Sequence, residues 1–346
     1  MENKLFALSD VYRKEKVKLD ENDNIELLLG GIMLNRIVGI AYDNLDLDTV
    51  PKEVIKVLKI VKQHNERSTD DFINNVCYVA DILNGATFKY ALLKGSFLTT
   101  KLYKRGLRTS NDIDILVEGK DVSALEKILL QNGFIQGYLN ENNEIIPASR
   151  REILHSRLNN GETVPFIKLI DGKKLEIDIN FSVDYKADGA RIVPQLLTDL
   201  HKVELNGHTF TTLNPVDFLI HLCCHLYKEA TTYDWIINRR DLMLYKFSDI
   251  NVMLTDFKDN KYYEDLIARI REFELEKECY YVFCNSCIIY PELKHSTAID
   301  MVLDTIKPED LRYMRQIIHP SEKRILSYDT NFTEWFDCSN RIIALN

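Results

Sequence analysis

Two aspartates one residue apart constrain this chain more than any other feature of its sequence. They lie in the run Asn111-Asp112-Ile113-Asp114-Ile115-Leu116-Val117, where acids alternate with apolar residues. This alternation predicts a β-strand, on which side chains two residues apart share a face and lie roughly 6.5–7 Å apart. Two carboxylates so placed repel each other by about 2–3 kcal/mol at an effective dielectric near 20. Either both acids are solvated at a strand end, or a cation lies between them.

The surrounding sequence favours the cation. Carboxylate oxygens with no Cys or His beside them suit Mg²⁺ or Mn²⁺ better than zinc. Upstream, the apolar run 88–93 predicts a strand that leads into Lys94-Gly95-Ser96, and helical spacing follows from Phe97 to Gly106. A Gly-Ser turn between strand and helix lets backbone amides approach a phosphate closely. Lys94, directly before that turn, is a further candidate for phosphate binding.

A second alternating segment carries more acids. In the run 174–181, Glu176, Asp178 and Asn180 share one face, and apolar residues occupy the other. If this strand lies beside the strand of Asp114, a third carboxylate can reach the same cation. Three carboxylates around two divalent ions about 3.5–4 Å apart suit in-line phosphoryl or nucleotidyl transfer. Both Asp178 and Glu176 are candidates for the third metal ligand.

These residues resemble a known family. A Gly-Ser turn, a helix, an Asp-hydrophobic-Asp strand and a later strand acid form the pattern of the DNA polymerase β-like nucleotidyltransferases. Within that superfamily the chain is similar to the bacterial group called uncharacterised nucleotidyltransferases, over about residues 50–255. The matching segments are Leu93-Lys94-Gly95, Tyr103, Gly106-Leu107-Arg108, 112–117, Asn132-Gly133-Phe134, 176–181 and 221–226.

The resemblance implies roles for several of these residues. Asp112, Asp114 and Asp178 would be catalytic and would hold Mg²⁺ or Mn²⁺, with Glu176 as a rival ligand. In the family, the later strand tends to read acid-hydrophobic-His, whereas this chain has Asn180 at the third position. That departure removes an imidazole that could handle a proton or contact a ligand.

Basic residues supply candidate phosphate contacts. Lys101, Lys104, Arg105 and Arg108 are spaced as on one stripe of a helix, and such a stripe is normally a solvated face. Arg108 matches an Arg of the family pattern, and its planar fork suits phosphate oxygens, so we expect it to bind nucleotide. Lys101 and Lys104 are expected to face solvent. Lys228, on a later predicted helix, is a weaker candidate for the phosphates or the acceptor.

Composition limits the class of protein. The chain has 346 residues and a formal net charge of −9, which argues against an extended nucleic-acid surface. No apolar run approaches about 18 residues, and the N-terminus does not read as a signal peptide. We therefore expect a soluble cytoplasmic protein with no membrane partner. Of the seven cysteines, those from Cys279 to Cys287 lie in an apolar predicted helix and are expected to be buried thiols rather than a zinc site.

The expected fold class is α+β, with a small mixed β-sheet nucleotidyltransferase core between helical regions. The predicted boundaries are a helical region at 1–85, the core at 86–212 and a helical domain at 213–346. The expected function is metal-dependent transfer of NMP from an NTP to a hydroxyl or similar acceptor, with release of pyrophosphate. A small molecule or protein acceptor is favoured over tRNA. The alternatives are a toxin-like transferase that modifies tRNA ends and a non-catalytic nucleotide-binding protein.

Overall fold

The fold was obtained as a computed structural model that describes residues 3–159, 161–183, 187–257 and 259–346. Its contacts group the chain into two compact units, one formed by residues 1–62 and 219–346 and the other by residues 63–218. The acidic strands predicted from the sequence lie in the second unit. The three-part division at 85 and 212 stays a prediction.

A mixed six-stranded sheet organises the second unit, in the order β1-β2-β6-β5-β3-β4. Its strands are β1 (Tyr90–Leu92), β2 (Ile113–Val117), β3 (Ile135–Leu139), β4 (Ile145–Pro147), β5 (Phe166–Ile170) and β6 (Lys173–Asn180). β2 and β6 are parallel, and the other pairs are antiparallel. This mixed sheet between helical segments confirms the predicted α+β class.

The period-2 alternation of β2 and β6 decides which side chains enter the core. Ile113, Ile115, Ile177 and Ile179 are each at most 1% exposed, and they pair across the two strands. Burying four such side chains contributes several kcal/mol at about 1.5–3 kcal/mol each. A slip by one residue would exchange this buried face for the acidic one, so the register is strongly specified.

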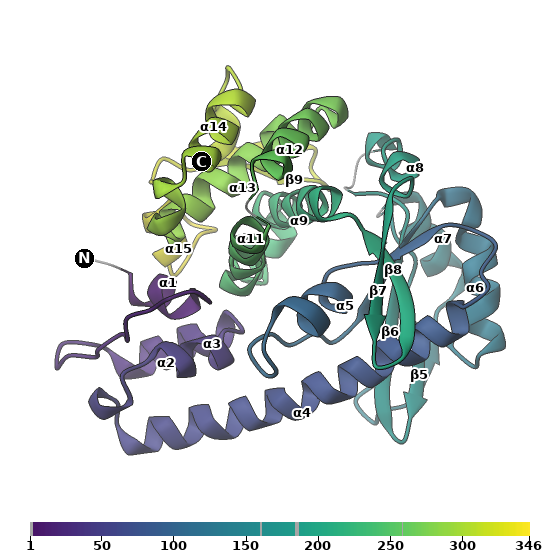
Figure 1. The fold of residues 1–346 in the computed structure, drawn as a ribbon, viewed down its shortest axis with the longest axis horizontal. Coiled ribbons are helices and arrows are strands. Elements are labelled where there is room, and N and C mark those ends of the chain that lie inside the picture. Colours follow the sequence, from purple (N-terminus) through teal and green to yellow (C-terminus); the bar gives the residue numbers. More distant parts are fainter. Residues whose placement is uncertain (1–2, 160, 184–186, 258) are drawn as a thin grey trace. The chain divides into compact units, whose positions relative to one another are not determined.

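Smaller elements complete the second unit. The hairpin of β7 (Leu200–Leu205) and β8 (His208–Leu213) lies beside β1, where the hydroxyl of Thr212 donates to the carbonyl of Leu92 at 2.6 Å (Figure 1). The remaining helices are α5 (Gly95–Phe97), α6 (Val122–Gln131), α7 (Arg150–Asn159) and α8 (Val193–Leu196). The long helix α4 (Lys52–Leu83) contributes Tyr78, whose ring stacks on that of Phe134.

The helix expected from Phe97 to Gly106 is wrong in its extent. α5 ends at Phe97, one π-helical turn covers Leu98–Leu102, and the chain is no longer helical from Tyr103 onwards. Gly106 has φ +81°, a left-handed conformation that glycine adopts readily. The basic stripe that this helix would have carried is therefore not formed.

The first unit is mainly helical (Figure 1). Its helices include α1 (Lys4–Ser9), α2 (Ile25–Leu34), α3 (Val38–Asn44), α10 (Tyr233–Ile237), α11 (Leu244–Asp256), α12 (Asn260–Phe273), α13 (Glu276–Ile289), α14 (Thr297–Ile306) and α15 (Phe332–Asp337). Helix α9 (Pro215–Ala230) begins after Asn214, whose side chain accepts a hydrogen bond from the amide of Asp217. A hairpin of β9 (Gln316–His319) and β10 (Arg324–Ser327) was not expected from the sequence.

Side chains near the C-terminus pack within the first unit. Trp335 is fully buried and stacks on Tyr328 with ring centroids 3.9 Å apart, while Arg341 forms an ion pair with the buried Asp241. The three cysteines of α13 are free thiols, of which Cys279 and Cys287 are buried as expected and Cys284 is only half-buried. Across the described residues, no helix combines the length and apolar character that a bilayer-crossing segment requires.

Candidate active site

The two predicted acidic strands lie side by side with their aspartates aligned. In the parallel pair β2–β6, Asp114 is the register partner of Asp178, so both side chains share one face of the sheet. Glu176 lies two residues before Asp178 on β6 and belongs to that face as well, and Asp112 directly precedes β2. The side chain of Glu176 pairs with Lys174. The charges of Asp114, Asp112 and Glu176 all act on Asp178, so the four predicted metal-binding acids lie near one another.

Lys94 adds a positive charge to this carboxylate cluster. Its Nζ lies 2.7 Å from Oδ1 of Asp114, whose side chain is 5% exposed. Burial lowers the pKa of Lys94, but the charges of Asp114, Asp112 and Asp178 outweigh burial and raise the pKa above its ordinary value. The ammonium is therefore held charged against the acids.

The backbone of Lys94 is strained. Its φ of 44° and ψ of −115° are values that a residue with a Cβ rarely adopts. Strain of this kind costs of order 1–3 kcal/mol and persists where the surrounding structure enforces it. Here the amide of Leu93 donates to the carbonyl of Asp114 at 2.9 Å, which fixes the end of β1 against β2. The turn that follows places Lys94 beside the acids.

Asp178 lies in an electrostatically unfavourable environment. Its Oδ1 atom is buried and has no hydrogen-bond partner within the described residues. Burial and then the negative charges of Asp114, Asp112 and Glu176 raise the pKa of Asp178 from 3.8 to about 8, while Lys94 opposes the rise. Asn180 donates a long hydrogen bond of 3.4 Å to Oδ1 of Asp114. The positive charge of Lys94 is therefore not enough to balance the negative charges of the cluster.

The Gly-Ser turn is closely packed. A Cβ at Gly95 would lie 2.1 Å from Oγ of Ser110, so only glycine fits there. The amides of Ser96 and Phe97 donate to the carbonyls of Leu93 and Lys94 and are engaged inside the turn. Oγ of Ser96 is buried and, among the described residues, has no hydrogen-bond partner. A phosphate at this turn would therefore rely on the Ser96 hydroxyl more than on these two amides.

Arg108 lies in a buried position, 7% exposed, rather than on an exposed stripe. Its Nη1 donates to Oγ1 of Thr99 at 2.9 Å and to Oγ of Ser110. Two other basic residues of the expected stripe are engaged elsewhere. Lys101 donates to the carbonyl of Glu204, and Arg105 pairs with Asp70. Arg108 thus joins the π-helical turn to the segment that leads into Asp112.

Ser110 and Thr99 are the residues that sequence reasoning missed. Their hydroxyls lie 2.9 Å apart, and both accept hydrogen bonds from Arg108. The only sequence signal for Ser110 is its place two residues before Asp112. For Thr99, the local pattern holds no comparable signal.

The chemistry of the cluster fits a hard divalent cation, because its donors are carboxylate oxygens and Oδ1 of Asp178 lacks a partner. The arrangement itself is not yet a coordination shell: within the described residues, no three His, Cys, Asp or Glu side chains are placed to hold a metal ion. The ammonium of Lys94 lies against Asp114 instead. A metal ion that used Oδ1 of Asp114 as a ligand would have to displace Lys94 from it.

The predicted residue Lys228 lies in the first unit, on α9. On the same helix, Nε2 of His225 pairs with Oε1 of Glu229 at 3.3 Å. Glu229 is 3% exposed and forms an ion pair with Lys246. The nucleotide-binding role of Lys228 stays a prediction.

A mixed sheet that aligns two aspartates beside a Gly-Ser turn defines a protein of the nucleotidyltransferase class. The chain belongs to the uncharacterised nucleotidyltransferase family, whose sequence pattern matches residues 21–287. Family membership supports a transferase that moves a nucleotidyl group. No curated protein matches the chain significantly.

One solved structure similar to this chain is an antigenic nucleotidyltransferase-like protein from Paracoccidioides brasiliensis. The two share 18% sequence identity, and the match covers 67% of this chain and 94% of that chain with a TM-score of 0.41. A resemblance this distant carries no information about the substrates of this chain.

Proposed function

We propose that this protein transfers NMP from an NTP to an acceptor hydroxyl or similar group, in a reaction that depends on Mg²⁺ or Mn²⁺. The observation that carries the proposal is the pairing of Asp114 with Asp178 on one face of the sheet, next to Lys94 and the Gly95-Ser96 turn. In this reaction a bond forms between the acceptor oxygen and the α-phosphorus, the bond to pyrophosphate breaks, and the acceptor proton is released.

The acids of the cluster would serve as the metal ligands. Asp112, Asp114 and Asp178 would hold the metal, with Glu176 as the rival third ligand. When bound, the divalent ions would neutralise phosphate charge and lower the pKa of the acceptor hydroxyl. Their positive charge would also relieve the repulsion that raises the pKa of Asp178.

Lys94 would act on the phosphates. Its ammonium already lies at the cluster, and a divalent ion at Asp114 would displace it. The Gly95-Ser96 turn is adjacent in the chain, so the displaced ammonium remains within reach of a triphosphate held there. Arg108 would hold Ser110, and with it the segment that leads into Asp112, in position. For Nη1 of Arg108 to contact a phosphate directly, it would have to break its hydrogen bond to Thr99.

The acceptor is proposed to be a small molecule or a protein rather than tRNA. A net charge of −9 opposes the electrostatic attraction on which extended nucleic-acid binding depends. We further propose that the protein acts in the cytoplasm.

A thermal-shift experiment tests the proposal. ATP, GTP, CTP and UTP are each added with and without Mg²⁺ to the wild type, to the double variant Asp112→Asn/Asp114→Asn and to Asp121→Asn, a control at an acid outside the cluster. Ligand at a hundred times its dissociation constant adds roughly 2.7 kcal/mol of stability. We expect a Mg²⁺-dependent rise in Tm for at least one nucleotide in the wild type and the control, and none in the double variant. An equal rise in the double variant would exclude this site.

A further inference from the structure

Helix α2 is almost entirely apolar. In its sequence, IELLLGGIML, Glu26 is the one charged residue. A helix that is apolar all round is normally enclosed in a protein core or a membrane. Across all ten residues of α2, which the structure describes in full, Ile32 alone is buried, while Leu27 is 73% and Leu34 47% exposed. The first unit therefore covers only part of an apolar helix.

The exposed leucines border an apolar groove of about 420 Å³. Leu27 and Leu34 lie three or four residues from Gly30 and Gly31, so the four residues share one face of α2, and all of them line the groove. Apolar side chains from α1, from the segment before α11 and from α15 form much of the remaining lining: Leu5, Leu242, Met243 and Phe336. All of these residues belong to the first unit.

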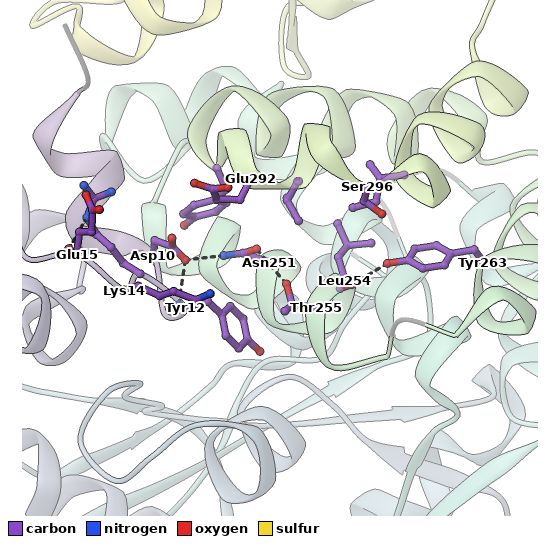
Figure 2. A pocket seen from close by; sticks show the side chains of 14 residues that line it. Asp10, Tyr12, Lys14, Glu15, Asn251, Leu254, Thr255, Tyr263, Glu292 and Ser296 are labelled. Atoms are coloured by element: carbon purple, nitrogen blue, oxygen red, sulfur yellow. Dashed lines mark hydrogen bonds between the residues drawn. The ribbon is translucent and has the colours of Figure 1, made fainter.

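Another cavity of the same unit has a different character. It has a volume of about 660 Å³ and is lined by acids, bases and uncharged polar side chains as well as by apolar ones (Figure 2). In its wall, Oδ1 of Asp10 accepts a hydrogen bond from Nδ2 of Asn251 at 3.0 Å. The groove beside α2 is distinguished from it by an apolar lining, which favours contact with another apolar surface.

Gly30 lies in the middle of the exposed face of α2. A Cβ at Gly31 would lie 2.7 Å from Cδ1 of Leu5, so this glycine makes room for Leu5. A Cβ at Gly30 would meet nothing within 4 Å among the described residues outside the backbone of its own helix. A glycine inside a helix is destabilising relative to alanine, and the described contacts of the chain give no reason for one at this position. A recess at Gly30 would let a second helix approach closely.

The rim of the groove carries charges of both signs. Glu26, Asp337 and Arg239 line it and are exposed. Arg341 also lines the groove and forms an ion pair with the buried Asp241. A two-fold axis brings a surface against its own copy, so a rim with one sign of charge would repel itself. This groove combines both signs with protruding leucines and a recess, and these features make the surface complementary to itself.

We propose that the face of α2 that carries Leu27, Gly30 and Leu34 is the interface between two copies of this chain. The two-fold axis passes near Gly30, where the two helices approach closely and run antiparallel. Leu27 of each copy then packs against Leu34 of the other. The interface uses no residue of the carboxylate cluster, so dimerisation is independent of nucleotidyl transfer.

Sedimentation velocity on the full chain at rising micromolar concentrations tests this proposal. We expect a reversible monomer–dimer equilibrium that Leu27→Ser and Leu34→Ser each weaken roughly tenfold or more, because each removes an apolar contact from the centre of the interface. Leu158→Ser is the matched control and should change nothing, since Leu158 is 81% exposed on α7 and does not line the groove.

Two results would overturn the proposal. One is a dimer that neither leucine variant weakens. The other is a wild type that stays monomeric throughout, and flotation of that monomer with phosphatidylcholine vesicles would assign α2 to a membrane surface instead.

Gly30→Leu separates a contact at the interface from a general loss of structure. Leucine is the better helix former, and its Cβ meets no neighbour in the recess, so we expect a higher Tm for the dilute monomer. The same side chain fills the recess and should weaken the dimer roughly tenfold or more. A dimer of unchanged affinity in this variant would refute the close approach at Gly30.

Discussion

The ammonium of Lys94 lies 2.7 Å from the carboxylate of Asp114, on the face of the sheet where the sequence predicts a metal cation. This pair links the strained turn after β1 to the acids of β2 and β6. Lys94 supplies positive charge to the cluster. The pKa of Asp178 is nevertheless raised, because burial and the negative charges of the other acids outweigh the attraction of Lys94. If a divalent ion binds at this cluster, as proposed, Lys94 and the ion compete for the same carboxylate.

Lys94→Met tests this competition. Removing one partner of a largely buried ion pair leaves the acids uncompensated, so we expect a loss of about 2–3 kcal/mol in the free energy of unfolding at pH 8 without metal. Mn²⁺ should then bind more tightly than to the wild type when nucleotide is absent. Chemical denaturation in EDTA and Mn²⁺ titration by electron paramagnetic resonance measure the two effects. Lys120→Met, at an exposed pair with Glu118, is the control and should change neither.

The stability of the wild type should fall with rising pH because of Asp178. Its folded pKa of about 8 lies above the ordinary 3.8, so the folded state binds this proton more tightly than the unfolded state does. The associated stability is fully present below about pH 4 and is lost as pH rises through about 8.

Asp178→Asn removes this titration. In EDTA, we expect its Tm to exceed that of the wild type by an amount that grows between pH 5 and pH 9. Mg²⁺ should narrow the difference at pH 9 by stabilising only the wild type. A Tm difference between the two proteins that does not change with pH would contradict the raised pKa.

Gly95→Ala should destabilise the protein through a steric clash. The added Cβ would lie 2.1 Å from Oγ and 2.6 Å from Cβ of Ser110, and overpacking of this kind costs about 1–3 kcal/mol. In a Ser110→Gly background, the same substitution should cost less, because the two nearest atoms are gone. A double-mutant cycle by urea denaturation measures the coupling. Additive effects of the two changes would show that Ser110 is not the obstacle.

Arg108→Lys should lower stability even without nucleotide. The guanidinium is buried and donates to Thr99 and Ser110, and a lysine cannot reproduce both hydrogen bonds. We expect a loss of about 2 kcal/mol in the free energy of unfolding. Arg105→Lys changes the same residue type at an exposed pair with Asp70 and should have little effect. If Arg108→Lys left stability unchanged and altered only nucleotide affinity, Arg108 would be a direct phosphate ligand.

Local patterns were enough to predict the main elements of the site. The alternation in 111–117 and 174–181 predicted β2 and β6, and it assigned the acids and the isoleucines to opposite faces. These features depend on residues close together in the chain, whose side-chain periodicity is visible in the sequence itself.

Features that depend on distant partners were not predicted. Helical spacing from 97 to 106 did not reveal that the helix gives way to a π-helical turn that ends at Leu102. The stripe that placed Arg108 among exposed cations failed for the same reason, and the structure buries Arg108 against Thr99 and Ser110.

The sequence by itself determined which residues can form acidic strands, where the Gly-Ser turn lies and to which family the chain is similar. Only the tertiary structure decided that Asp178 is the register partner of Asp114 and that Lys94 lies against Asp114. The physical reason is that strand pairing and register arise from packing between segments more than 60 residues apart, here 114 and 178, and side-chain periodicity within one segment carries no information about its partner.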